Sequence, residues 1–172
     1  MKFAFIAVQE RGQVDHLLAE LANRLIAEGA RLAGVVQINA ERAGARHCDM
    51  LVKVLPNGSL FDISQKLGNE SRGCRLDVGA LEQAVASVQA SLENSPDIDL
   101  LIINKFGKHE AIGRGFRDLI AEMLLRGIPV LLGVNRLNRP AFEEFADGAA
   151  IELAADEAAI YQWCRDNSLL PA

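Results

Sequence analysis

Short apolar segments alternate along this chain with longer segments whose apolar residues recur at helical spacing. The first short segment, 3–8, is apolar without a break, which is typical of a parallel strand covered on both faces. From Gln13 to Glu28 the apolar residues recur every three or four positions, and Gly29 provides a helix stop. This order predicts an α/β protein of the doubly wound type, with a mainly parallel sheet, helices on both faces and right-handed connections.

The alternation continues to the C-terminal end of the sequence. Further strands are expected at 32–38, 99–103, 129–134 and 149–153, and further helices at 78–92, 115–126 and 156–167. Pro56-Asn57-Gly58 is a turn signal between two apolar segments, which predicts a small antiparallel hairpin inserted at about 47–64. No linker or repeat interrupts the pattern, so residues 1–172 are predicted to form one domain.

The composition narrows the classes of function. Half of the 172 residues are hydrophobic, as in ordinary globular proteins. The net charge of -5 argues against a general nucleic-acid binder, because duplex binding needs clustered Lys and Arg. No apolar segment approaches the roughly 20 residues that cross a bilayer, and the N-terminal segment turns polar too early for a secretory signal. We therefore expect a cytoplasmic protein that binds neither nucleic acid nor membranes.

Three cysteines, Cys48, Cys74 and Cys164, form no Cys-x-x-Cys pair, so neither a disulfide framework nor a zinc site is indicated. Cys74 lies between two arginines, which favour its thiolate, but no histidine is spaced to act as its base. We expect reduced, packed thiols, no metal site and no catalytic nucleophile.

The loop after the first strand lies where sheets of this class bind ligands, beyond the carboxyl end of a strand. A phosphate-binding loop there needs several glycines, a lysine for the outer phosphates and a Ser or Thr for magnesium. The loop has Gly12 as its one glycine, and Val14 and Asp15 stand where the lysine and the hydroxyl residue are expected. The Walker A function is therefore degenerate.

Two interpretations of this loop stay open. It is a plain connection from strand to helix, which is the simpler interpretation. Alternatively, Arg11, Gly12 and Gln13 bind an anion at the start of the helix, where the helix dipole favours negative charge.

The segment 104–110, Asn-Lys-Phe-Gly-Lys-His-Glu, is the densest cluster of polar side chains in the chain. As a guanine-reading Asn-Lys-x-Asp motif it fails, because Gly107 offers no carboxylate. Its lysines, Lys105 and Lys108, precede a helix N-terminus expected near Gly113, and both features favour an anion. The alternative is a solvated basic loop that opens an amphipathic helix.

A second candidate for anion binding is formed by hydroxyl, amide and guanidinium donors before the second long helix. These donors are Ser64, Gln65, Ser71, Arg72, Gly73 and Arg75. If this loop folds over the sheet edge, its arginines close the same pocket as the segment 104–110. The alternative is a structural loop in which Arg75 pairs with Asp77 or Glu82.

Three segments together carry a family resemblance: 44–46 (Gly-Ala-Arg), 73–78 (Gly-Cys-Arg-Leu-Asp-Val) and 104–110. They resemble the P-loop nucleoside triphosphatases typified by a small thermophilic NTPase, in which Asp-Glu-Ile-Gly-Lys-Met-Glu aligns without gaps to 104–110. Almost the full chain is more similar still to a bacterial family of unknown function related to those NTPases. That resemblance implies a P-loop NTPase-like fold and a link to molybdate-transport genes.

The departures from the active relatives imply a loss of chemistry. Asn104 stands where the resemblance places the magnesium-orienting Asp, and Lys105 stands where it places the Glu that activates water. Triphosphate hydrolysis depends on a bridging metal and a positioned water. One site cation and two carboxylates are lost and Lys105 is gained, which makes the cleft about two charges more positive. We expect such a cleft to bind an oxyanion or a nucleotide phosphate without metal.

The leading prediction is therefore a non-hydrolysing nucleotide- or oxyanion-binding regulatory protein, linked through the resemblance to molybdenum handling and with no cofactor identified. Its predicted ligand contacts include Asn104, Lys105, Gly107, Lys108 and Glu110. One alternative is a nucleoside triphosphatase or nucleotide-transfer enzyme with a remodelled site, in which Lys105 or Lys108 holds phosphates and Glu110 is a base or metal ligand. Another is an interaction module or homodimer that uses the terminal apolar segment 160–163.

Overall fold

The computed structural model describes residues 2–8, 10, 12–40, 49–65 and 76–167. Of the predicted features, Arg11, the segment 44–46, Cys48 and the segment 71–75 lie outside these residues. The elements are β1 (Phe3–Val8), α1 (Gln13–Ala27), β2 (Leu32–Ala40), β3 (Asp49–Val54), β4 (Leu60–Asp62), α2 (Val78–Asn94), β5 (Leu100–Phe106), α3 (Lys108–Ala111), α4 (Arg117–Leu125), β6 (Val130–Asn135), α5 (Arg139–Ala146), β7 (Ile151–Leu153) and α6 (Glu157–Asn167).

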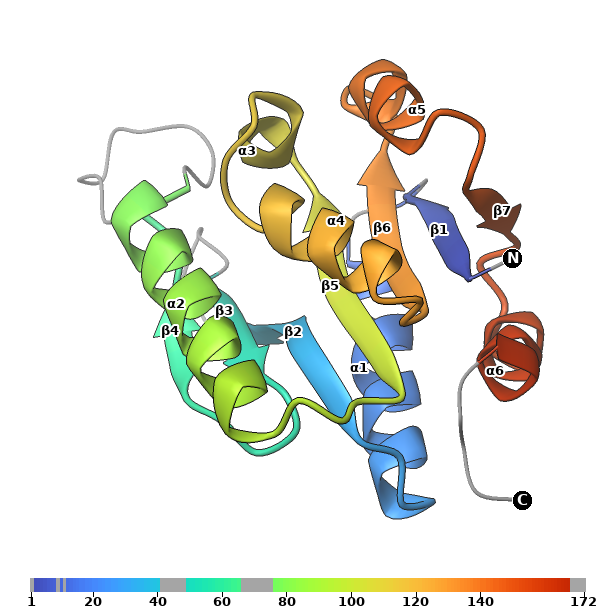
Figure 1. Ribbon diagram of the computed structural model, residues 1–172. Helices are drawn as coiled ribbons and strands as arrows, with labels where there is room; N and C mark the ends of the chain where they lie inside the picture. The colour runs from blue at the N-terminus through green and yellow to red at the C-terminus, as the bar shows by residue number, and fades with distance from the viewer. Residues whose placement is uncertain (1, 9, 11, 41–48, 66–75, 168–172) are drawn as a thin grey trace.

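The described strands form one seven-stranded sheet in the order β4-β3-β2-β5-β6-β1-β7 (Figure 1). Strands β2, β5, β6, β1 and β7 pair in parallel, whereas β3 is antiparallel to both β2 and β4. This confirms the predicted α/β class with a mainly parallel sheet. The predicted hairpin is β3 and β4, and it widens the sheet at one edge.

Two apolar layers enclose the sheet, one on each face. Helices α1 and α6 cover one face, where Leu18 and Leu25 pack in the same core as Trp163. Helices α2, α4 and α5 cover the other face, and in Figure 1 α2 and α4 lie in front of the sheet with α1 behind it. Strands covered on both faces are apolar at nearly every position, which explains the unbroken apolar segments of β5 and β6.

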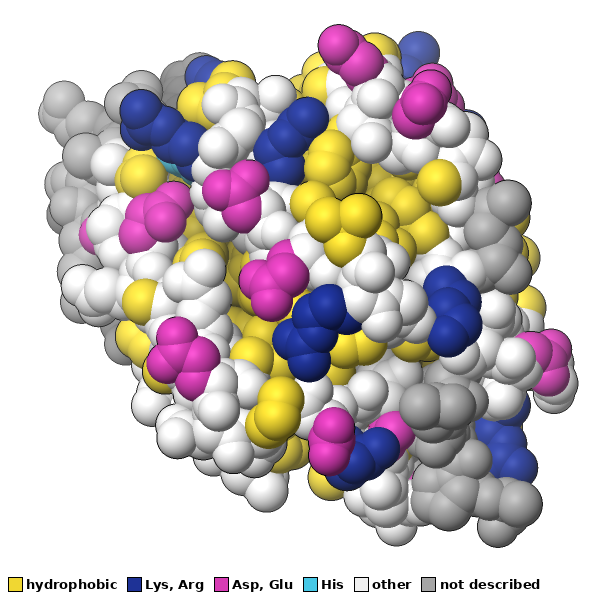
Figure 2. Space-filling view, in the orientation of Figure 1, with side chains coloured by type: hydrophobic (Ala, Val, Ile, Leu, Met, Phe, Trp, Pro, Cys, Tyr) yellow, Lys and Arg dark blue, Asp and Glu magenta, His cyan; other side chains and the backbone are white. Residues whose placement is uncertain are grey.

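The near face of the molecule shows a hollow between α2 and α4. Figure 2 shows apolar side chains reaching the surface there, and Leu92 and Leu119 line a groove of about 550 Å³. Glu93, Glu122 and Arg126 also line this groove. We call it the α2–α4 groove.

No helix within the described ranges is both long and apolar enough to cross a membrane.

The structure corrects two predicted boundaries and adds two helices. Strand β5 runs on through Phe106, so Asn104 and Lys105 belong to a strand and not to a loop. No helix begins near Gly113, which lies between α3 and α4 with φ +84°, because α4 starts only at Arg117. Helices α3 and α5 were not predicted; α5 is polar over most of its surface and is recognisable in the sequence only from its N-terminal Pro140.

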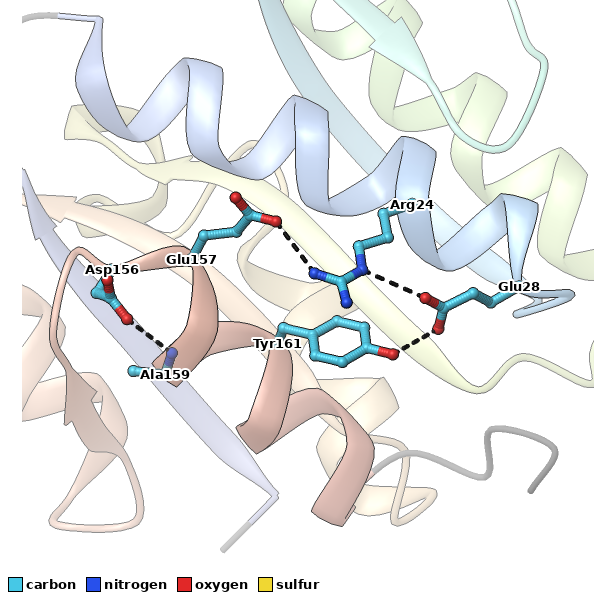
Figure 3. Close-up of polar contacts among 6 residues, drawn as sticks. All are labelled: Arg24, Glu28, Asp156, Glu157, Ala159 and Tyr161. Atoms are coloured by element: carbon cyan, nitrogen blue, oxygen red, sulfur yellow. Dashed lines mark hydrogen bonds and ion pairs between the residues drawn. The ribbon is translucent and has the colours of Figure 1, made fainter.

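Helix α6 docks on α1 through both apolar and polar contacts. Ile160 and Trp163, predicted as an alternative interaction face, are 1% and 6% exposed because they pack against the chain's own core. At the rim, the Arg24 guanidinium lies 3.6 Å from the centre of the Tyr161 ring (Figure 3). Arg24 donates to Glu28 and Glu157, and the Tyr161 hydroxyl donates to Glu28 at 2.8 Å. The terminal helix is thus part of this fold.

Cys164 follows in the same core. Burial raises the pKa of its thiol to about 12, so the thiol stays protonated and unreactive at neutral pH. This agrees with the prediction of a packed thiol for this cysteine, whereas Cys48 and Cys74 lie outside the described residues.

We expect the apolar part of the α1–α6 contact to dominate its stability. Trp163→Ala should lower the free energy of unfolding by about 3–5 kcal/mol, because it removes a buried ring and leaves a cavity. Arg24→Met should lower it far less, since exposed ion pairs add little. Urea denaturation followed by circular dichroism measures both, and an equal loss in the two variants would contradict this ranking.

At the amino ends of the strands, Asp99 joins β2 to β5. Burial alone would raise the pKa of this carboxyl, but the hydrogen bonds and the charge of Arg31 outweigh burial and hold the pKa below its usual value. A carboxyl whose pKa falls on folding stabilises the fold at neutral pH, and this stabilisation is lost as the pH drops through the folded pKa.

Asp99→Asn should therefore destabilise the protein most at pH 7. The difference from the natural protein should shrink as the pH falls below about 4, where the carboxyl of the unfolded chain takes up its proton first and that of the folded chain follows at lower pH. Urea denaturation of both proteins at pH 7 and pH 3 measures it. A difference that grows towards low pH would refute the assignment.

Candidate functional site

A β-bulge at the carboxyl end of β5 sets the geometry of the site. Ile103 pairs with Leu132 and Phe106 pairs with Val134, so two residues of β5 lie opposite the single residue Gly133 of β6. Such a bulge adds a residue to one strand and re-aims the side chains around it. Phe106 therefore returns to the face of Ile103, where its ring packs against those of α5.

Because of the bulge, Asn104 and Lys105 both reach the same side chain on α1. The Asn104 amide donates to Asp15 Oδ1 at 2.9 Å, and Lys105 Nζ lies 2.9 Å from the same oxygen. Asn104 Oδ1 in turn accepts from the backbone N–H of Gln37 on β2. We call these four residues, Asp15, Gln37, Asn104 and Lys105, the Asp15 cluster.

The Asp15 cluster is buried apart from the end of Lys105. Asp15 and Asn104 are 3% and 4% exposed, whereas the Lys105 side chain is 32% exposed. A buried carboxylate is tolerated when a cation and hydrogen-bond donors surround it. Asp15 also lies in the first turn of α1, where the helix dipole favours a negative charge.

Asp15 changes the charge balance expected from the sequence. From the sequence, the cleft is expected to carry about two more positive charges than that of the active relatives. The Asp15 carboxylate lowers this value, because it lies 2.9 Å from Lys105 Nζ and offsets its charge. The sequence does carry a signal for it: Asp15 and Gln37 are polar residues inside apolar patterns, Asp15 beside Val14 on α1 and Gln37 within β2. The contact of Asp15 and Gln37 with residues of β5 is visible only in the three-dimensional structure.

The Glu110 carboxylate accepts hydrogen bonds from two backbone N–H groups. Its Oε2 accepts from the N–H of Gly107 at 2.8 Å and its Oε1 accepts from the N–H of Phe116 at 3.0 Å. A Cβ at Gly115 would lie 2.2 Å from Glu110 Oε1, so the turn before α4 closes directly on this carboxylate. Gly107 and Glu110 also line a pocket together with Asn104 and Lys105. The role of Glu110 as a base, metal ligand or ligand contact stays a prediction.

The other predicted contacts divide into three groups. Gly12 is the N-cap of α1, with φ +84° and no side-chain cap hydrogen bond, and Gln13 is exposed at the start of this helix. Lys108 is exposed at the start of α3. At the end of the hairpin, the hydroxyl and the backbone N–H of Ser64 both donate to the Asp62 carboxylate, so the hydroxyl already has an acceptor. Gln65 beside it is exposed.

Arg11, Ser71, Arg72, Gly73 and Arg75 lie outside the described residues, so a pocket shared by the two predicted loops stays a prediction. Among the described residues, no three His, Cys, Asp or Glu side chains gather in a way that could hold a metal ion. The described part of the site therefore consists of the Asp15 cluster and the uncapped start of α1.

The ion pair at the centre of the Asp15 cluster should be coupled energetically. Lys105→Met should lower the free energy of unfolding by about 1–3 kcal/mol, because it leaves a buried carboxylate with fewer partners. Adding Asp15→Asn should cost about 1 kcal/mol less than the sum of the two single losses. Chemical denaturation of the four proteins measures the coupling, with exposed Lys108→Met as the control, and strict additivity would show that the pair is not formed.

Two solved structures share this fold at low sequence identity. One is the solution structure of a human cancer-related nucleoside triphosphatase, with a TM-score of 0.65, 17% identity, and coverage of 96% of this chain and 95% of that chain. The other is the crystal structure of THEP1 from the hyperthermophile Aquifex aeolicus, with a TM-score of 0.64, 18% identity and 96% coverage of both chains. These likenesses confirm the predicted P-loop NTPase-like fold.

Closer relatives appear at the level of sequence. The chain is 35% identical over 167 residues to the molybdenum import ATP-binding protein ModC 2 of Bradyrhizobium diazoefficiens, an alignment that covers 97% of this chain but only 18% of that protein. Residues 3–163 match the model of a family described as "Protein of unknown function (DUF2478)". That match spans most of the chain, which therefore belongs to the DUF2478 family.

Proposed function

We propose that this protein is a non-hydrolysing regulatory domain that binds a nucleotide or an oxyanion without metal and serves molybdenum handling. The observation that carries the proposal is the contact of Lys105 Nζ with Asp15 Oδ1 at 2.9 Å, with the Asn104 amide on the same oxygen. The carboxylate nearest the start of α1 is thereby engaged by the chain's own cation.

The absence of hydrolysis follows from what the described site offers a triphosphate. Phosphoryl transfer to water needs a metal that bridges the outer phosphates and a group that positions the water. A magnesium ion at Asp15 would have to displace the Lys105 ammonium or lie beside it against charge repulsion. The Glu110 carboxylate, which the sequence suggested as an alternative base, is held by two backbone N–H groups.

Anion binding is supported by the groups that remain open. The Lys105 side chain is partly exposed, and the N-cap residue of α1, Gly12, makes no side-chain cap hydrogen bond. Backbone N–H groups at a helix start and a nearby ammonium are the usual donors for phosphate-like anions. Asp15 weakens this attraction, so we expect modest affinity.

The link to molybdenum rests on the relative. A protein named as a molybdenum import ATP-binding protein contains a segment 35% identical to nearly this whole chain, which makes up 18% of its length. A domain similar to a segment of such an ATP-binding protein, with the carboxylates of Asp15 and Glu110 engaged by its own groups, fits a role in sensing the transported oxyanion or a nucleotide.

Isothermal titration with phosphate, sulfate, molybdate, tungstate, ATP and GTP, each in EDTA and in magnesium, tests the proposal. We expect at least one anion to bind equally well in both conditions, with no release of phosphate from ATP or GTP. Asp15→Asn should tighten that binding about tenfold, or about 1.4 kcal/mol, because it removes the carboxylate that competes for Lys105. Lys105→Met in the Asp15→Asn background should abolish it.

Matched controls separate the alternatives. Lys108→Met removes an exposed cation outside the Asp15 cluster and should leave the affinity within about twofold, less than 0.5 kcal/mol. Magnesium-dependent turnover would contradict the proposal and favour the remodelled enzyme. Absence of binding by every anion would contradict it as well and favour the interaction module.

A further inference from the structure

A pocket opens between the sheet and the helix layer next to the Asp15 cluster. It has a volume of about 230 Å³. Val35, Val52 and Ile103 of the sheet line it, as does Ile63 directly after β4. Leu81 of α2 and Phe116 at the start of α4 line it from the helix layer. We call it the β5–α2 pocket.

Ordinary core packing does not account for this space. Each of the six apolar wall residues is at most 7% exposed, so the pocket is cut into the core layer. Protein interiors are close-packed, with few voids larger than a water molecule. Small-molecule sites, in contrast, combine apolar walls with a few polar groups at one end.

The polar end of the pocket belongs to the Asp15 cluster. Gln37, Asn104, Lys105, Gly107 and Glu110 line it there. The Glu110 oxygens accept from the N–H groups of Gly107 and Phe116, so Lys105, which also contacts Asp15, is the cation among these polar residues. A ligand that fills the pocket therefore borders Lys105. An apolar cavity of about 150 Å³ holds a benzene ring, so 230 Å³ admits a fused bicyclic ring.

We propose that the β5–α2 pocket receives the flat ring of a small organic anion whose acidic group lies at Lys105. This inference rests on the proposed function and gives the ligand a chemical class: a bicyclic ring of nucleobase size that carries a phosphate or carboxylate. The ring supplies buried apolar area and the acidic group supplies the contact with the ammonium. A bare inorganic oxyanion uses only the second of these.

Titration with inorganic phosphate and with 1-naphthyl phosphate tests the pocket. We expect naphthyl phosphate to bind at least tenfold more tightly. Val52→Phe, which fills the pocket, should reduce this preference to less than twofold while phosphate binding stays within twofold of the natural protein. Gln89→Phe, which fills the α2–α4 groove instead, should keep the preference.

Methyl NMR of the natural protein covers the case in which Val52→Phe does not fold. On addition of naphthyl phosphate, the methyl resonances of Val35, Val52 and Ile103 should shift, while those of Leu18 and Leu25 on the opposite face should not. Equal affinity for the two phosphates, or shifts confined to the opposite face, would overturn the pocket and leave the proposed function standing. Failure of both phosphates to bind would overturn the pocket alone, and the proposed function falls with it only if sulfate, molybdate, tungstate, ATP and GTP also fail to bind.

Discussion

A buried carboxylate has to find donors, and in this protein Asp15 finds them on a strand that follows it by almost ninety residues. The Asn104 amide and the Lys105 ammonium converge on one oxygen of Asp15, both at 2.9 Å. This contact fixes the first turn of α1 against the carboxyl end of β5. The bulge in β5 brings these two side chains to Asp15, and it also places Phe106 on the face of Ile103. The backbone N–H of Gln37 on β2 donates to the Asn104 side chain and holds it there.

The same contact distinguishes the described site from the one that the resemblance to P-loop NTPases implies. The resemblance to P-loop NTPases implies an Asp that orients magnesium at position 104 and a Glu that activates water at position 105. Here an amide and an ammonium occupy those positions and satisfy a carboxylate of the chain itself. On the proposed function, this arrangement replaces magnesium, and the partly exposed Lys105 side chain contacts the anion.

Much of the fold could be predicted because apolar spacing reports it directly. The central strands and α1, α2 and α6 were recognised within a few residues. The end of β5 was missed because Asn104 and Lys105 are polar, and a polar stretch after an apolar one looks like a loop. Helix α5 was missed because only Phe142 and Ala146 of its eight residues are buried, which is too short a pattern to recognise.

The site was predicted in part. The resemblance to P-loop NTPases identifies Asn104 and Lys105, because they stand where it places an Asp and a Glu. It identifies Asp15 only as the residue at the position of the phosphate-loop Ser or Thr, and not as their partner. Nothing in the sequence places Asp15 next to 104–105, because their contact depends on the strand order and on the bulge. Glu110 was assigned to chemistry, whereas its carboxylate holds the N–H groups of Gly107 and Phe116, a role visible only in three dimensions.

The most direct test of the central claim is a crystal structure obtained with manganese and a non-hydrolysable ATP analogue, with data collected for the anomalous signal of manganese. The claim predicts that Lys105 Nζ stays on Asp15 and that no anomalous peak lies at that carboxylate. A manganese ion bound to Asp15, with Lys105 turned away towards the phosphates, would contradict it and restore a metal-dependent site.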